Sequence, residues 1–238
     1  MKTEIVEYKG GGTTFRGYLA YNENEKRSGK RPGILVMPVP TGLGDHAKER
    51  AERLARLGYI ALAGDPYGNG TTVHTAQEAM KLAMPLLDDP AKMRHLGHLA
   101  LNKLMSIPQT DPSKLAEIGF SMGGSFGPEL ARDGAPLAAV AVFHAGLQTK
   151  SPAELGKVKA KILVQTGADD PIVPFDQIKA FEEEMTRAGA DWQLISYGGT
   201  KHGFTNPEAA GNPALAYNKT VDDRSWKLMV SFLEETFA

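Results

Sequence analysis

The sequence predicts an α/β fold with one doubly wound, mostly parallel sheet and helices on both of its faces. Short, unbroken apolar runs such as residues 33–37 and 162–165 are typical of strands that are covered on both sides. Segments with the apolar spacing of helices separate these runs, so strands and helices alternate along the chain. No internal repeat, low-complexity tract or composition shift marks a linker, and we expect residues 1–238 to form a single domain.

The first half of the chain is expected to open with an antiparallel hairpin and to continue with alternating elements. Asp45 is predicted to cap a helix, and Gly58 to end it. The segment 64–90 is the least regular part of the sequence, with a turn over 65–70. The expected elements are strands over 3–8 and 14–21, a charged surface loop over 22–31, strands over 33–37 and 59–63, and helices around 45–57, 74–84 and 90–106.

The second half is expected to contain four further strands, each followed by a helix or an irregular segment. The expected strands are 115–120, 137–143, 162–165 and 192–195. One helix should present Phe175, Ile178, Phe181 and Met185 on a single apolar face, and an amphipathic helix from about Val221 closes the chain. In such a sheet, ligands bind beyond the carboxyl ends of the strands.

Charge and cysteine content exclude several functional classes. The chain has 27 basic and 28 acidic residues, a net charge of −1, so we expect a small-molecule partner and neither nucleic acid nor a membrane surface. The absence of cysteine excludes disulfides, thiolate metal sites and a cysteine nucleophile. Residues 1–8 lack the apolar core of a signal peptide, and no run has transmembrane length. We therefore expect a cytoplasmic protein, either a monomer or a small homo-oligomer.

The most informative motif is the Gly-x-Ser-x-Gly pentapeptide over 119–123, which follows an apolar strand and opens a helix. This is the pattern of a nucleophile elbow, in which the serine stands on a strained turn and the glycines let strand and helix pack closely. Ser121 is therefore the candidate nucleophile. The N–H of Met122, at the start of the helix, is a candidate donor to an oxyanion.

A serine nucleophile needs a base and a group that orients the base. In an elbow fold these follow the serine in the order carboxylate, then histidine. The loop after the strand 162–165 carries Asp169 and Asp170, and the loop after the strand 192–195 carries His202 between glycines. Both loops lie at carboxyl ends of strands, so we expect one of the two carboxylates and His202 to complete a triad with Ser121.

We expect the five histidines other than His202 to have mainly structural roles. His95 and His98 are three residues apart on a helix, but no acidic or cysteine partner has metal-ligand spacing, so we expect a solvated face and no metal site. His46 is expected near the rim of the pocket and His74 near a helix start. His144 is expected to be a hydrogen-bonded core residue that could also line the site. No glycine-rich segment has the phosphate-binding pattern.

Four segments together resemble the dienelactone hydrolase family of α/β-hydrolases. They are Gly-Phe-Ser-Met-Gly-Gly over 119–124, Gly-Ala-Asp-Asp-Pro-Ile-Val-Pro over 167–174, Tyr-Gly-Gly-Thr-Lys-His-Gly-Phe-Thr-Asn-Pro over 197–207, and the closing residues 216–226. The resemblance extends over nearly the whole chain. It implies an α/β-hydrolase fold without a large lid, no cofactor, and a catalytic triad of Ser121, Asp170 and His202.

The sequence departs from the family pattern at the nucleophile. The resemblance implies a cysteine at the position of Ser121, together with a glutamate at the position of Val39 that helps to control the thiol. Both are replaced here, and a hydroxyl, which is far less acidic than a thiol, needs His202 as a general base instead. We interpret the chain as a serine esterase on a thiol-hydrolase scaffold. An engineered cysteine-to-serine change is the alternative, and Val39 argues against it.

Two further departures concern the oxyanion and the substrate. The resemblance implies an oxyanion N–H at the position of Pro40, and proline has none, so Thr41 is expected to supply a donor through its N–H or hydroxyl. The resemblance also implies an arginine for a substrate carboxylate where Asn206 stands, and an amide cannot make that bidentate contact. Uncharged, short-chain esters are therefore the expected substrates. The residues expected to line the pocket are Val39, Pro40, Thr41, Tyr67, His144, Phe204 and Asn206.

The sequence thus predicts a carboxylic-ester hydrolase that acts through an acyl-enzyme. Hydrolysis of a lactone, a dienelactone or a thioester on the same triad is one alternative. A non-catalytic α/β-hydrolase that binds a ligand is the other, and it is motivated by Pro40 and the absent glutamate.

Overall fold

The computed structural model describes residues 1–23, 29–209 and 212–238, and its centre is one mixed sheet. Within these residues, eight strands pair in the order β1-β2-β4-β3-β5-β6-β7-β8. Their bounds are β1 Lys2–Gly10, β2 Thr13–Tyr21, β3 Arg31–Met37, β4 Ile60–Ala63, β5 Thr110–Phe120, β6 Ala139–Phe143, β7 Lys161–Gly167 and β8 Trp192–Tyr197. The predicted doubly wound, mostly parallel sheet is confirmed.

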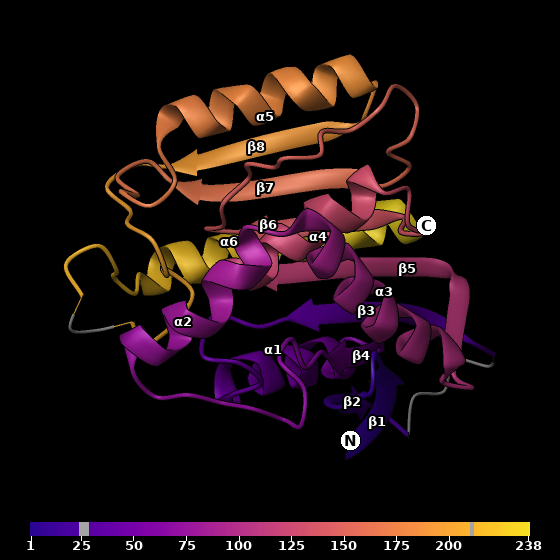
Figure 1. The fold of residues 1–238 in the computed structure, drawn as a ribbon. Helices are drawn as coiled ribbons and strands as arrows, with labels where there is room; N and C mark the ends of the chain where they lie inside the picture. Colours follow the sequence, from indigo (N-terminus) through magenta and orange to yellow (C-terminus); the bar gives the residue numbers. More distant parts are fainter. Residues whose placement is uncertain (24–28, 210–211) are drawn as a thin grey trace.

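The pairing directions follow from the connections. β1 and β2 form the predicted hairpin and pair antiparallel along their whole length, and β2 is antiparallel to β4. The remaining pairs, from β4 through β8, are parallel, because helices make the crossover connections except between β6 and β7, where the irregular segment 144–160 does so. The arrows of β3, β7 and β8 therefore point to the same side in Figure 1, and the loops that carry the predicted triad emerge at that edge.

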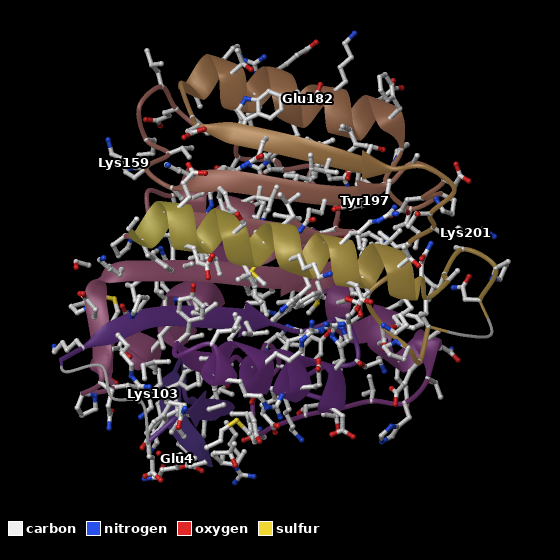
Figure 2. All side chains as sticks on the ribbon, turned by 180° about the vertical axis from the view of Figure 1, so that it is seen from behind. Glu4, Lys103, Lys159, Glu182, Tyr197 and Lys201 are labelled. Atoms are coloured by element: carbon white, nitrogen blue, oxygen red, sulfur yellow. The ribbon has the colours of Figure 1, made fainter. Side chains whose placement is uncertain are left out.

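Helices cover both faces of the sheet. Figure 1 shows α2, α3, α4 and α5 on the near face, and Figure 2, from behind, shows α6 lying across the far face with α1 beside it. The bounds are α1 Asp45–Arg56, α2 Ala76–Leu87, α3 Pro90–Ser106, α4 Met122–Arg132, α5 Phe175–Ala188 and α6 Lys219–Phe237. No helix among the described residues combines the length and the apolar character that crossing a membrane requires.

Alternation along the central strands divides the core between the two faces. On β5, Leu115 belongs to the cluster under α2 to α5, whereas Ala116, Ile118 and Phe120 belong to the cluster under α1 and α6. Every residue of β6 is buried, which is why its sequence, Ala-Val-Ala-Val-Phe, has no polar position. The core thus fixes the central strand that ends at Ser121 from both sides.

Several expected details of the elements are corrected. Gly44, not Asp45, is the N-cap of α1; Asp45 is its first residue and lies 3.8 Å from Lys48 Nζ. The helix expected over 74–84 spans 76–87 and is capped by the side chain of Thr75. Phe175 is 73% exposed, because it is the first residue of α5 and precedes the packed turns. Within the expected loop over 22–31, residues 24–28 lie outside the described residues, and Arg31 is a buried residue of β3.

Glu117 places a carboxyl group in the core, on β5 four residues before Ser121. It is fully buried, and neither of its oxygens has a hydrogen-bond partner among the described residues. Its side chain occupies the space left by Gly119 and Gly127, where a Cβ would collide with the carboxyl oxygens. Burial raises the pKa of Glu117 well above its usual value. Burial in the folded protein therefore favours the neutral form of this carboxyl group.

We expect Glu117→Gln to change the pH dependence of stability. The unfolded chain ionises Glu117 above its ordinary pKa, so this group alone lowers the free energy of unfolding by about 1.4 kcal/mol per pH unit from there up to its raised folded pKa. Glutamine cannot ionise and lacks this loss. We measure the free energy of unfolding by urea at pH 5 and at pH 7.5. The value at pH 7.5 minus the value at pH 5 should be more negative for the wild type than for Glu117→Gln. Parallel pH profiles of the two proteins would contradict the neutral carboxyl.

Candidate active site

Ser121 lies on a strained turn between the end of β5 and the start of α4. Its backbone has φ 53° and ψ −123°, a conformation that a serine adopts only at a cost. Its N–H donates to the Phe143 carbonyl of the neighbouring strand at 3.0 Å, which holds the strained residue in place. The strand, turn and helix at 119–123 have the geometry of a nucleophile elbow.

Two glycines make this close turn possible. A Cβ on Gly119 would collide with the carbonyl oxygen of Gly123, and a Cβ on Gly123 would collide with the carbonyl oxygens of Met37 and Pro38. The first turn of α4 is therefore packed against both β5 and the end of β3. This contact brings the Pro38–Thr41 loop next to the elbow.

The structure brings Ser121, His202 and Asp170 together in one chain of hydrogen bonds. Ser121 Oγ lies 2.8 Å from His202 Nε2, and His202 Nδ1 lies 2.7 Å from Asp170 Oδ2. Only 4% of His202 and 6% of Asp170 are exposed, so the two side chains are shielded from water. This is the arrangement in which a histidine accepts the serine proton while a carboxylate fixes its tautomer.

Asp170, and not its neighbour Asp169, is the carboxylate that reaches His202. The second oxygen of Asp170 accepts the N–H groups of Ile172 at 2.8 Å and Val173 at 3.2 Å, which orients the carboxylate. Asp169 is exposed, and its backbone N–H donates to the Thr200 carbonyl at 3.0 Å. That bond ties the Asp170 loop to the loop that carries His202.

His144 and Phe204 form a layer behind His202, and the expectation that they line an open pocket is corrected. Both are completely buried. The ring centroid of His144 lies 5.1 Å from that of His202 and 4.9 Å from that of Phe204. As expected, His144 is a hydrogen-bonded core histidine: its Nε2 lies 2.8 Å from Thr205 Oγ1. Burial holds the pKa of His144 well below its usual value, so no second positive charge faces His202.

Thr205 is the centre of a buried network that the sequence did not reveal. Its carbonyl oxygen accepts Arg50 Nη2 at 2.6 Å and lies 3.2 Å from His46 Nε2. Arg50 also contacts both oxygens of Asp222 at 3.0 Å. His46 is half-buried and contacts Thr205 from α1, and desolvation lowers its pKa to about 3; its place near a pocket rim stays a prediction. The network ties α1 and α6 to the segment that follows His202.

The remaining predicted residues lie on the loops around the elbow. Val39 and Pro40 are half-buried after β3, and Tyr67 is half-buried after β4. Asn206 is half-buried as well, and its Oδ1 accepts the N–H of Glu208 at 3.0 Å, which closes a local turn. Lys201, labelled in Figure 2 at the carboxyl edge of the sheet, turns away to the Pro213 carbonyl at 2.8 Å.

Two backbone N–H groups are candidate oxyanion donors, as predicted from the sequence. Met122 is the first residue of α4, so its N–H has no acceptor inside the helix. Thr41 is in the turn that the Gly42 N–H closes by donating to the Val39 carbonyl at 3.0 Å. Among the described residues, no acceptor takes the Thr41 N–H. The Thr41 N–H therefore remains a candidate to replace the donor missing at Pro40.

The structure shows no candidate metal site in the part of the chain that it describes. There, no group of three or more histidine, cysteine, aspartate or glutamate side chains has the geometry to hold an ion. His98 Nε2 instead lies 2.8 Å from Asp133 Oδ2 at the surface, and His95 is exposed.

The sheet order, the elbow and the sequence of Ser, Asp and His loops define an α/β-hydrolase, and no large lid is present in the described residues. A family model described as the dienelactone hydrolase family matches residues 15–237. The chain belongs to the dienelactone hydrolase family and is a hydrolase.

The chain is similar to proteins of known structure or sequence. The structure of a dienelactone hydrolase-like promiscuous phosphotriesterase from metagenomic libraries is 40% identical, with a TM-score of 0.91, and covers 99% of this chain and 98% of its own. An uncharacterized protein of Caenorhabditis elegans is 37% identical over 158 residues, 63% of this chain and 98% of that protein. A Saccharolobus solfataricus protein, whose proposed activity is that of a carboxymethylenebutenolidase, is 25% identical over 98% of both chains.

Proposed function

We propose that this hydrolase cleaves small, uncharged carboxylic esters through an acyl-enzyme on Ser121. The observation that carries the proposal is the chain of 2.8 Å and 2.7 Å contacts from Ser121 through His202 to Asp170. His202 Nε2 takes the hydroxyl proton as Ser121 Oγ attacks the ester carbonyl, and it then returns the proton to the leaving alcohol. A water molecule, activated in the same way, releases the acid.

The buried surroundings of His202 favour this cycle. When His202 becomes protonated, Asp170 supplies the compensating negative charge at its other ring nitrogen. His144 and His46 stay neutral and do not oppose the new charge. The developing oxyanion is assigned to the N–H groups of Met122 and Thr41.

The site has features that disfavour a carboxylate-bearing substrate. Two cationic side chains at the His202 loop are engaged elsewhere: Arg50 by Asp222 and the Thr205 carbonyl, and Lys201 by the Pro213 carbonyl. Asn206 has its oxygen in a local turn and carries no charge. A substrate anion would therefore find no free ionic partner in Arg50, Lys201 or Asn206.

A panel of p-nitrophenyl esters of increasing acyl length, with an anionic dienelactone included, tests the proposal. We expect turnover of the short esters, and a kcat/KM for the anionic lactone that is lower by at least about tenfold, which corresponds to one lost ionic contact. A preference for the lactone would overturn the substrate class. Absence of turnover on every member would favour the ligand-binding alternative.

A second candidate is hydrolysis of phosphotriesters. It is motivated by the metagenomic relative, which is 40% identical and is described as a promiscuous phosphotriesterase. The same Ser121 would attack phosphorus in place of a carbonyl carbon.

The cytoplasmic location and the monomeric or small oligomeric state stay predictions.

A further inference from the structure

The loop over 39–42, next to the elbow, lacks one backbone N–H donor. Residues 39–42 form a turn in which Gly42 donates to the Val39 carbonyl at 3.0 Å, and Pro40 occupies the second position. Proline fixes this turn but has no N–H. The one remaining N–H inside the turn is that of Thr41, so the orientation of the Pro40–Thr41 peptide decides where the only available donor points.

Tyr67 reaches this peptide from a distant part of the chain. Its hydroxyl lies 2.8 Å from the Pro40 carbonyl oxygen and 3.2 Å from Met122 Sδ. A hydroxyl has a single proton, and a carbonyl oxygen is a far better acceptor than a thioether sulfur, so Tyr67 donates to Pro40. The same side chain thus contacts Met122, whose N–H is one proposed oxyanion donor, and Pro40, whose carbonyl belongs to the same peptide as the other proposed donor, the Thr41 N–H.

The bond to Pro40 constrains the N–H of Thr41. The Pro40–Thr41 peptide is trans, and in a trans peptide the carbonyl and the N–H point in opposite directions. Holding the Pro40 carbonyl on the Tyr67 side therefore holds the Thr41 N–H on the other side. The next peptide is fixed as well, because the Val73 N–H donates to the Thr41 carbonyl at 3.0 Å.

Tyr67 is itself held in place by Asp65 at the end of β4. Asp65 is 2% exposed, and its Oδ1 accepts the N–H groups of Tyr67 at 3.1 Å and Gly68 at 2.8 Å. Its Oδ2 accepts Arg16 N at 2.9 Å, which ties the turn to β2. Burial raises the pKa of the Tyr67 hydroxyl above its usual value, so the group keeps its proton and remains a donor.

We infer that Tyr67 is a positioning residue of the oxyanion site: its hydroxyl holds the Pro40 carbonyl so that the Thr41 N–H replaces the donor absent at Pro40. The inference rests on the proposed ester hydrolysis. It assigns to Tyr67 no contact with the substrate. It also explains how a site with proline at this position retains two donors.

The first test compares Tyr67→Phe with Tyr18→Phe on a short p-nitrophenyl ester. Tyr18 is the matched control, because its hydroxyl donates to Glu52 at 2.8 Å, away from the elbow. Deleting an oxyanion donor costs about a hundred- to a thousandfold in turnover, so loosening one should lower kcat by about ten- to a hundredfold. We expect this loss in Tyr67→Phe with KM changed less than about twofold, and no loss in Tyr18→Phe.

The second test repeats Tyr67→Phe in a Pro40→Ala background. Alanine restores an N–H at position 40, so the site no longer depends on Thr41 alone and the Tyr67→Phe loss should shrink to less than about threefold. An equal loss in both backgrounds would overturn the inference and point to a direct role of the hydroxyl. An unchanged kcat in Tyr67→Phe alone would also overturn it. No turnover by the wild type would instead overturn the proposed function, and with it this inference.

Discussion

Ser121→Ala will lower kcat/KM for a short p-nitrophenyl ester by a factor on the order of 10⁴ or more, because no other group can form the acyl-enzyme. The loss is expected in kcat, since Ser121 acts on the bound ester and is not needed to bind it. Steady-state kinetics with the wild type as reference measure both constants. The alanine protein should keep its fold, because the Ser121 N–H still donates to the Phe143 carbonyl.

Ser125→Ala is the matched control for this change. Ser125 lies one turn further along α4 and is 7% exposed, and its hydroxyl donates to the Gly146 carbonyl at 2.8 Å. Its loss should affect stability by about 1 kcal/mol and kcat by less than about threefold. If Ser121→Ala kept more than about a tenth of the wild-type kcat/KM, Ser121 would not be the nucleophile.

Asp170→Asn should lower kcat by a factor on the order of 10⁴ while leaving the protein folded. An amide placed at Asp170 donates to His202 Nδ1, which moves the ring proton to Nε2. That nitrogen then faces Ser121 Oγ, at 2.8 Å, as a donor and cannot accept its proton. The measurement is kcat against pH for the wild type and the variant.

Asp169→Asn provides the comparison at the neighbouring residue. Asp169 is exposed, and only its backbone N–H takes part in the loop contacts, so its side chain should be replaceable without loss of kcat. Equal effects of the two aspartate changes would contradict the assignment of Asp170 as the group that orients His202.

The parts of the fold that the sequence predicted are those set by local chain properties. The unbroken apolar runs identified the central strands. The motif over 119–123 identified the elbow, because the close packing there requires glycine two residues before and two residues after the serine. The loops of Asp170 and His202 could be located because each follows directly on a predicted strand. Parallel strands bring these loops to one edge without further information.

The errors and omissions concern contacts between distant segments. The sequence did not show that the packing of α1 and α6 on the same face brings His46 and Arg50 to Thr205, more than 150 residues later. The bond between Tyr67 and the Pro40 carbonyl is likewise invisible in the sequence, because neither residue type signals it. His144 and Phe204 were expected in the pocket, and their burial depends on contacts between the segments that follow β6 and β8.

The N-cap of α1 was predicted wrongly for a reason that is local in the sequence. Asp45 is a better N-cap residue than glycine in general, but Gly44 has the extended backbone of a cap here, and Asp45 is drawn into the first turn near Lys48. An acidic side chain is also favoured in the first turn by the helix dipole, so the sequence alone did not distinguish the two positions.

The central claim is that Ser121 is an activated nucleophile, and covalent labelling tests it most directly. Wild type and Ser121→Ala are treated with a fluorophosphonate, which reacts with serine only where a neighbouring base activates the hydroxyl. We predict one adduct per wild-type chain by intact mass, located on the peptide that contains Ser121, and none on Ser121→Ala. An unlabelled wild type, or a label on another residue, would contradict the account.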